Sequence, residues 1–236
     1  MDGVAKLGWR IIDASEQRLE SVAQNIANTG TFGYKSERSF EAMTAESIIM
    51  SNSGGEYISS IDMADGSLVE TGNPLDLALS GGGFFVVRRG EDLYLTRNGQ
   101  FSRGDEGQLV LPGGATAQLA GGGDAVIGTG LVTILPDATI TVDAVPVGRL
   151  AVVDLETVDG LDRHDNGLFA MPSEEAEQMP DPVVRQAMLE ASNVSLGEEM
   201  VAMMEAMRRA ETGQRVIQTY DQLMGRVLQA FGGAGR

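Results

Sequence analysis

Residues 195–231 read SLGEEMVAMMEAMRRAETGQRVIQTYDQLMGRVLQAF and form the most regular stretch of the chain. Ser195 and Glu198 have the spacing of a helix capping box. A 3-4 repeat then continues for five heptads, and all but two of its positions are apolar: Leu196, Met200, Met203, Met207, Ala210, Gln214, Ile217, Asp221, Met224, Leu228 and Phe231. This pattern predicts a helix of about 55 Å with a coiled-coil seam.

The amino-terminal residues 1–28 carry a second amphipathic pattern. Two neighbouring apolar faces are spaced by three and four residues, with charged side chains between them. The first face holds Val4, Leu7 and Ile11, and the second holds Ile12, Leu19, Val22 and Ile26. Asn28 and Gly30 both tolerate the left-handed conformation that closes a helix, so we expect the helix to end there.

The middle of the chain has the pattern of an antiparallel β domain. Residues 74–172 contain alternating and continuous apolar runs, such as Phe84–Val87, that are separated by glycine-rich turns. Asn98-Gly99 predicts a type I′ hairpin turn, because that turn needs positive φ at both positions. We expect residues 36–73 to be an extended linker that contains one short strand, and residues 173–189, which begin with an acidic stretch, to be a second linker.

These patterns together predict an α+β fold. Residues 1–35 and 190–236 would form a terminal helical domain, in which the two long helices pair as an antiparallel coiled coil. The central domain would be mainly antiparallel β structure. Two paired helices of these lengths cannot cover both apolar faces of the first helix, which favours association with other subunits. A closed two-helix bundle that only completes the fold is the alternative.

Composition excludes several classes of function. The 236 residues include 34 Asp and Glu but only 17 Lys and Arg, and this net charge of −17 repels phosphate backbones, so we expect no nucleic acid partner. The absence of cysteine excludes disulfides and thiolate metal sites. No apolar run approaches the roughly 20 residues that cross a bilayer, so we expect no membrane insertion. The amino terminus lacks the pattern of a cleaved signal peptide.

Catalytic and cofactor chemistry also finds no support. The glycine triplets at 81–83 and 121–123 lack the Lys-Ser/Thr ending of a phosphate-binding loop. His164 is the only histidine, and no nucleophile-elbow motif accompanies it. The acidic residues between Asp159 and Asn166 do not have calcium-loop spacing. We therefore expect no catalytic residue, no cofactor and no metal.

Four blocks of sequence resemble the bacterial flagellar rod and hook protein family. Residues 25–35, NIANTGTFGYK, resemble its amino-terminal signature, and residues 71–78 with 83–87, TGNPLDLA and GFFVV, resemble its next block. Residues 94–101, YLTRNGQF, are similar to its hairpin. Residues 189–194, LEASNV, resemble the carboxy-terminal signature together with Glu199-Met200-Val201 and Arg208. The blocks occur in the family's order, and the short middle domain is most similar to that of proximal-rod subunits.

The resemblance implies an axial structural protein that polymerises into the torque-transmitting rod of the flagellar basal body. Such subunits pass through the flagellar type III export apparatus without a cleaved signal peptide and assemble in the periplasm with other copies and homologous rod subunits. Assembly or packing roles are then expected for Asn25, Ile26, Ala27, Asn28, Thr31, Gly33, Tyr34 and Lys35, and for Ser192, Asn193, Val194, Glu199, Met200, Met203, Met207, Arg208, Ile217, Met224 and Leu228. A distal-rod or hook-type subunit, or an acidic secreted β-domain binding module with a closed helical hairpin, is the alternative.

Overall fold

The computed structural model describes residues 3–42, 56–155, 161–171 and 176–232. The chain divides into two compact units. The helical unit consists of residues 1–27, 37–59 and 195–236. The β unit consists of residues 28–36 and 60–194.

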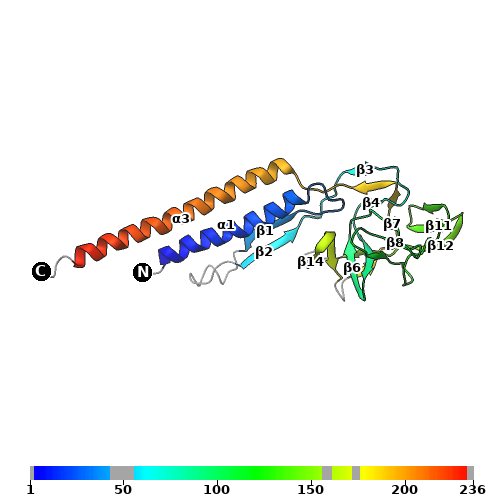
Figure 1. Cartoon of the computed structure of the whole chain (residues 1–236), viewed down its shortest axis with the longest axis horizontal. Helices are drawn as coiled ribbons and strands as arrows, with labels where there is room; N and C mark the ends of the chain where they lie inside the picture. Colours follow the sequence, from blue (N-terminus) through cyan, green and yellow to red (C-terminus); the bar gives the residue numbers. More distant parts are fainter. Residues whose placement is uncertain (1–2, 43–55, 156–160, 172–175, 233–236) are drawn as a thin grey trace. The chain divides into compact units, whose positions relative to one another are not determined.

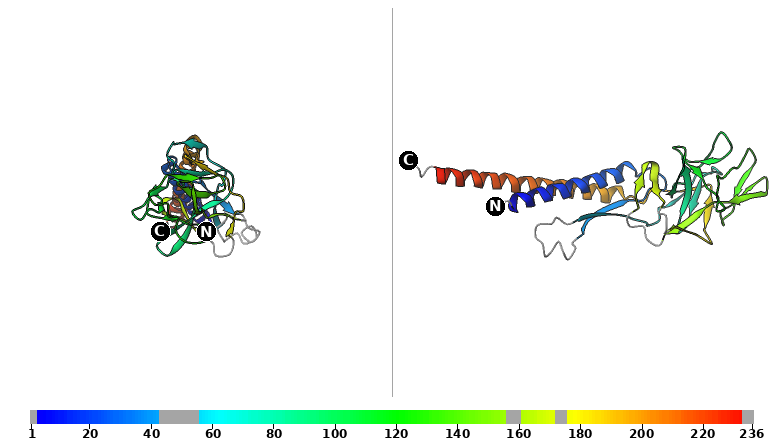
Figure 2. Two further views of the ribbon diagram at one scale, coloured as in Figure 1. Left: turned by 90° about the vertical axis from the view of Figure 1, so that its right-hand side faces the viewer. Right: turned by 90° about the horizontal axis from the view of Figure 1, so that it is seen from below.

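Two long helices dominate the helical unit. Helix α1 (Gly3–Ala27) and helix α3 (Leu196–Gly232) lie side by side and run in opposite directions (Figures 1 and 2). The last turns of α3 continue past the start of α1 (Figure 1). Strands β1 (Glu37–Ala42) and β2 (Glu56–Ile61) pair with each other, and β1 packs on α1. The predicted terminal helices are therefore confirmed. Neither of these described helices has the length and apolar character needed to span a membrane.

Small residues allow α1 and α3 to approach closely. A Cβ atom added to Gly213 would lie 2.8 Å from the Ile12 Cγ1 atom and 3.0 Å from the Gly8 carbonyl oxygen. Ala206, about two helical turns before Gly213, is fully buried. At such a crossing, a larger side chain would force the backbones apart.

The residues of α3 that face α1 differ in part from the repeat predicted from the sequence. Met203, Ile217 and Met224 are half-buried, as a seam requires. Met200 and Met207, in contrast, are 52% and 49% exposed. At the close approach the seam uses residues one position earlier, Ala206 and Gly213 instead of Met207 and Gln214, because only small side chains fit there. The polar positions Gln214 and Asp221 are exposed and lie off the seam.

The β unit is built from short antiparallel strands. Its largest sheet has the order β14-β15-β6-β5-β9-β8-β7, and β13 pairs with both β5 and β16. A three-stranded sheet, β10-β11-β12, and the strand pairs β17–β4 and β18–β3 complete it. The bounds are β3 (Leu68–Glu70), β4 (Leu77–Leu79), β5 (Phe84–Arg89), β6 (Asp92–Thr96), β7 (Ser102–Arg103), β8 (Leu109–Val110), β9 (Thr116–Ala117), β10 (Val132–Ile134), β11 (Thr139–Val142), β12 (Val145–Arg149), β13 (Val152–Leu155), β14 (Arg163–His164), the 3₁₀ turn η1 (Asp165–Gly167), β15 (Leu168–Ala170), β16 (Ala176–Gln178), β17 (Val184–Gln186) and β18 (Met188–Glu190).

Strand β5 is central because both of its faces are buried. Phe85 and Val87 point into a large core that also contains Leu77 and Ile140. Phe84 and Val86 point into a smaller core on the other side of the sheet, together with Leu95 and Phe169. Successive strand residues face opposite sides, so a continuous apolar run is what a doubly covered strand requires. The predicted buried strand is confirmed.

Both predicted linkers contain strands. Residues 36–73 include β1, β2 and β3, and residues 173–189 include β16, β17 and most of β18. Strand β3 pairs with β18, from Glu70 opposite Met188 to Leu68 opposite Glu190. The sequence pattern misses β3 because this strand is exposed along its whole length, so no alternation of buried apolar residues marks it.

The Asn98-Gly99 turn prediction is wrong. Neither residue has positive φ, whereas Gly90, in the tight turn between β5 and β6, has a φ of 68°. Gly99 serves a different purpose, because a Cβ atom there would lie 1.7 Å from the Leu77 carbonyl oxygen. The Leu77 N–H donates a 2.9 Å hydrogen bond to the Gly99 carbonyl, so glycine permits two backbones to meet.

Candidate assembly surface and its anchoring network

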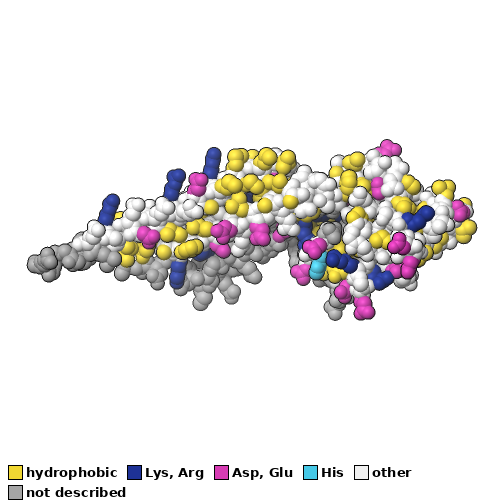
Figure 3. Space-filling view, in the orientation of Figure 1, with side chains coloured by type: hydrophobic (Ala, Val, Ile, Leu, Met, Phe, Trp, Pro, Cys, Tyr) yellow, Lys and Arg dark blue, Asp and Glu magenta, His cyan; other side chains and the backbone are white. Residues whose placement is uncertain are grey.

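Large apolar side chains are exposed on both terminal helices. Figure 3 shows hydrophobic side chains gathered over the first turns of α3. The exposed residues are Val4, Leu7 and Trp9 on α1, and Leu196, Met200, Val201, Met204, Met207, Leu223 and Val227 on α3. The second predicted face of α1 is partly or fully buried, whereas Val4 and Leu7 of the first face stay open to solvent. Large apolar side chains left exposed on a helix face in this way mark an interaction site.

Asn25 ties three elements of the helical unit together. Its side-chain amide pairs with the backbone of Glu37 in both directions, donating to the carbonyl at 2.8 Å and accepting from the N–H at 2.9 Å. The same Nδ2 group donates to the Glu199 carboxylate at 3.0 Å. The Ser21 hydroxyl also donates to the Glu37 carbonyl. Two predicted signature residues, Asn25 and Glu199, therefore meet at the point where α1, β1 and α3 converge.

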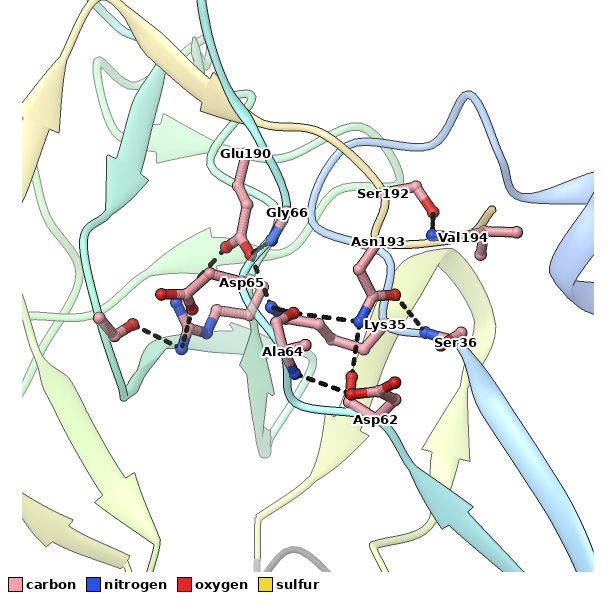
Figure 4. Close-up of polar contacts among 12 residues, drawn as sticks. Lys35, Ser36, Asp62, Ala64, Asp65, Gly66, Glu190, Ser192, Asn193 and Val194 are labelled. Atoms are coloured by element: carbon pink, nitrogen blue, oxygen red, sulfur yellow. Dashed lines mark hydrogen bonds and ion pairs between the residues drawn. The ribbon is translucent and has the colours of Figure 1, made fainter. Parts of the chain in front are cut away.

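A buried charge network occupies the β unit (Figure 4). The Lys35 Nζ atom lies 2.6 Å from the Glu190 Oε1 atom, and their side chains are 0% and 2% exposed. Lys35 also donates to the Ala64 carbonyl, and the Gly66 N–H donates to Glu190. The buried Arg97 Nη1 atom lies 3.4 Å from the other Glu190 oxygen. One carboxylate thus neutralises two cations that have left water, which makes it costly to remove.

Backbone contacts bring the amino- and carboxy-terminal signatures together inside the β unit. Gly33 has a φ of +69°, and a Cβ atom there would lie 2.3 Å from the Arg97 carbonyl carbon. Its N–H donates to the Glu190 carbonyl at 2.7 Å. The Asn193 side chain accepts from the Ser36 N–H at 2.7 Å and donates to the Asp62 carbonyl at 2.7 Å (Figure 4). These residues hold segments of the same chain against one another.

The other predicted site residues make only local contacts or are exposed. Tyr34 is buried, with the Arg163 guanidinium carbon 4.3 Å from its ring centroid. The Thr31 hydroxyl donates to the Asn28 side chain, and the Ser192 hydroxyl accepts from the Val194 N–H. Of the remainder, Ile26 is partly buried, Ala27 and Arg208 are exposed, and the Leu228 side chain lies outside the described part.

Sequence reasoning missed several residues that organise this region. Glu190 and Arg97 lie in blocks that resemble the family, but no assembly or packing role was predicted for either residue. None was predicted for Gly8 or Gly213. A lone acidic residue directly after the apolar Leu189 was the available signal for a buried ion pair. The glycines of the helix crossing gave no apolar signal.

The structure offers no metal centre among its described residues, where no group of three or more Asp, Glu or His side chains could hold an ion. Asp159 lies outside that part of the chain. The His164 ring packs edge-on against Tyr94.

On the surface, hydrogen bonds from the Arg88 guanidinium and then the Gln118 amide lower the pKa of Asp124 below its ordinary 3.8.

Comparison with known proteins identifies the family. Residues 185–230 match the model of the flagellar basal body rod FlgEFG protein C-terminal region, and residues 78–150 match that of the flagellar hook protein FlgE/F/G D1 domain. The flagellar basal-body rod protein FlgF of Caulobacter vibrioides is 30% identical over 98% of this chain and 99% of its own length. The chain belongs to the flagellar basal-body rod protein family. FlgF of Salmonella typhimurium is 33% identical over 94% of this chain and 96% of its own. The rod protein FlgG of Buchnera aphidicola is 28% identical over 94% and 95%. Within the family the chain is most like FlgF.

Proposed function

We propose that this chain is a structural subunit of the proximal flagellar rod and that it polymerises through its terminal helices. The observation that carries the proposal is the exposed apolar surface on α1 and α3 of a rod-family protein. Water contact with Leu196, Met200 and Met204 is unfavourable, and burial against a neighbouring subunit would remove it. The subunit would pass through the type III export apparatus and transmit torque within the periplasmic rod.

Coiled-coil packing of α1 against α3 is part of this proposal. Two 3-4 repeats support it, one on each helix. The α1 repeat contains Gly8, Ile12, Ser15, Leu19 and Val22, and the α3 repeat contains Ala206, Ala210, Gly213, Ile217 and Tyr220. Sustained repeats with this spacing keep one helix face turned toward a partner helix. A rigid hairpin of this kind would carry load along its length.

The substitution Met207→Asp tests the proposed surface. Because Met207 is half exposed in the single chain, a carboxylate there stays hydrated and the fold should survive. In an assembled rod the same carboxylate would lose its hydration and replace apolar contacts, at a cost of several kcal/mol. In a flagellated bacterium that lacks its own copy of the protein, we expect loss of motility and of the subunit from isolated basal bodies.

The matched control is Thr219→Asp, which adds the same charge at an exposed polar position of the same helix. We expect this variant to enter basal bodies. Circular dichroism of both purified variants should match the wild-type chain. Normal motility of the Met207→Asp strain would contradict the proposal.

A distal-rod position is the second candidate, since full-length similarity extends to FlgG. The location of a fluorescently or gold-labelled subunit within partial rods distinguishes the two positions. The third reading, a secreted binding module with a closed hairpin, requires a monomer whose terminal helices resist proteolysis on their own.

A further inference from the structure

An arginine-lined groove runs along the helical unit. It extends over three turns of α1, from Leu7 to Arg18, and Arg209 of α3 contributes to its wall. Leu7, Ile11 and Ala14 provide apolar surface, and Arg10, Arg18 and Arg209 provide three positive charges. The Arg18 Nε atom is buried without a hydrogen-bond partner. An apolar surface rimmed by arginines, one of them with an unsatisfied donor, suits a helix that carries apolar side chains and a carboxylate.

The chain contains such a helix segment. Leu196, Met200, Met204 and Met207 are exposed on α3 at spacings of four, four and three residues, which places them on one face. Glu211, exposed and four residues further, continues the same line. We call these five residues the methionine stripe, and its apolar part is visible over the first turns of α3 (Figure 3).

The groove and the stripe lie on different faces of the hairpin. Met207 belongs to the stripe and Arg209 to the groove, and residues two apart on a helix point about 200° away from each other. A molecule therefore cannot place its own stripe in its own groove. A contact between unlike surfaces of two copies is heterologous, and it repeats from subunit to subunit instead of closing as a two-fold dimer.

The two surfaces also match in length and charge. The groove from Leu7 to Arg18 and the apolar stripe from Leu196 to Met207 each cover eleven residue steps, or about 16 Å of helix. We propose that the arginine groove of one subunit receives the methionine stripe of the next copy of this chain. This contact rests on the proposed rod function and specifies its geometry.

Single cysteines test the contact directly, because the chain has none of its own. Ala14→Cys labels the groove and Met204→Cys labels the stripe. Both variants are produced in one strain that lacks the wild-type protein, and basal bodies are isolated and oxidised. A disulfide requires the two Cα atoms to come within about 7 Å, so only adjacent surfaces react.

We expect a dimer band when both variants are present and none when either is present alone. A band from Met204→Cys alone would show a two-fold contact and overturn the proposal. If both variants are in basal bodies but no mixed dimer forms, the contact is wrong while the rod function stands. Absence of the wild-type chain from basal bodies would overturn both. Ile11→Cys with Met200→Cys provides an independent pair if either first variant fails to fold.

Charge reversal gives a second measurement. Glu211→Lys reverses the charge at one end of the stripe, so that a cation meets the arginine-rimmed groove, and we expect about tenfold less mixed dimer from the cysteine pair. Thr212→Lys, at an exposed position outside the stripe, is the matched control and should leave the yield unchanged. Equal yields from Glu211→Lys and the control would refute the role of the groove charges.

Discussion

Replacement of Glu190 by glutamine should strongly destabilise the β unit, because this carboxylate contacts two buried cations. The Glu190 carboxylate accepts from the Lys35 Nζ atom at 2.6 Å, the Gly66 N–H at 2.9 Å and Arg97 at 3.4 Å. Glutamine keeps the shape but removes the negative charge beside buried Lys35, and it leaves Arg97 only the exposed Asp65 carboxylate at 4.0 Å. The Lys35 ammonium would still donate to the Ala64 carbonyl, but that acceptor is neutral.

The magnitude follows from burial. Loss of one partner of a buried ion pair costs about 3–5 kcal/mol, because the remaining charge stays out of water. The Arg88–Asp124 pair provides the comparison within the same chain, since its N–O distance is also 2.6 Å but its side chains are 40% and 29% exposed. Solvent screens an exposed pair, so Asp124→Asn should be far less destabilising than Glu190→Gln.

Urea unfolding of the purified full-length variants, followed by far-ultraviolet circular dichroism, measures the free energies. The expected order of stability is wild type, then Asp124→Asn a little lower, then Glu190→Gln lower by several kcal/mol. Equal effects of the two substitutions would refute the argument, since it attributes the difference to burial at equal distance. A Glu190→Gln variant as stable as the wild type would refute it as well.

Three further substitutions give distinct outcomes. Gly33→Ala should destabilise the β unit by more than about 1 kcal/mol, because Gly33 combines positive φ with a close backbone contact. Gly30→Ala, at a position with nothing within 4 Å, is the control and should not destabilise it. Thermal unfolding measures both effects. Gly213→Val should push the two helices apart and lower the melting temperature of the helical signal, while Gly225→Ala on the same helix, with no neighbour within 4 Å, should preserve it. The folded chain lowers the pKa of Asp124, so the stability from its ionised form is complete above the ordinary 3.8 and is lost as the pH falls through the lowered value. Unfolding curves of wild type and Asp124→Asn should therefore differ at neutral pH and converge in acid; a constant difference would contradict this.

The terminal helices and the central buried strand could be predicted because their signals are periodic and local. Helix α3 occupies Leu196–Gly232, against an expected 195–231, and α1 ends at Ala27, one residue before the expected stop. Phe84–Val87 lies in a strand with both faces buried. Each of these segments carries its own pattern of apolar residues.

The helix seam and the charge network could not be predicted, for two physical reasons. Ala206 and Gly213 are selected by close backbone approach, which leaves no hydrophobic periodicity to detect. Lys35 and Glu190 are far apart in sequence, and charged residues are normally exposed, so nothing local indicates that they meet in the interior. The exposure of Met200 and Met207 likewise depends on which face the partner helix occupies.

A subunit-resolved structure of an intact basal body tests the central claim most directly. We expect this chain to lie in the rod, with Leu196, Met200 and Met207 buried against neighbouring subunits. A rod without this chain, or a rod in which those three side chains still face solvent, would contradict it.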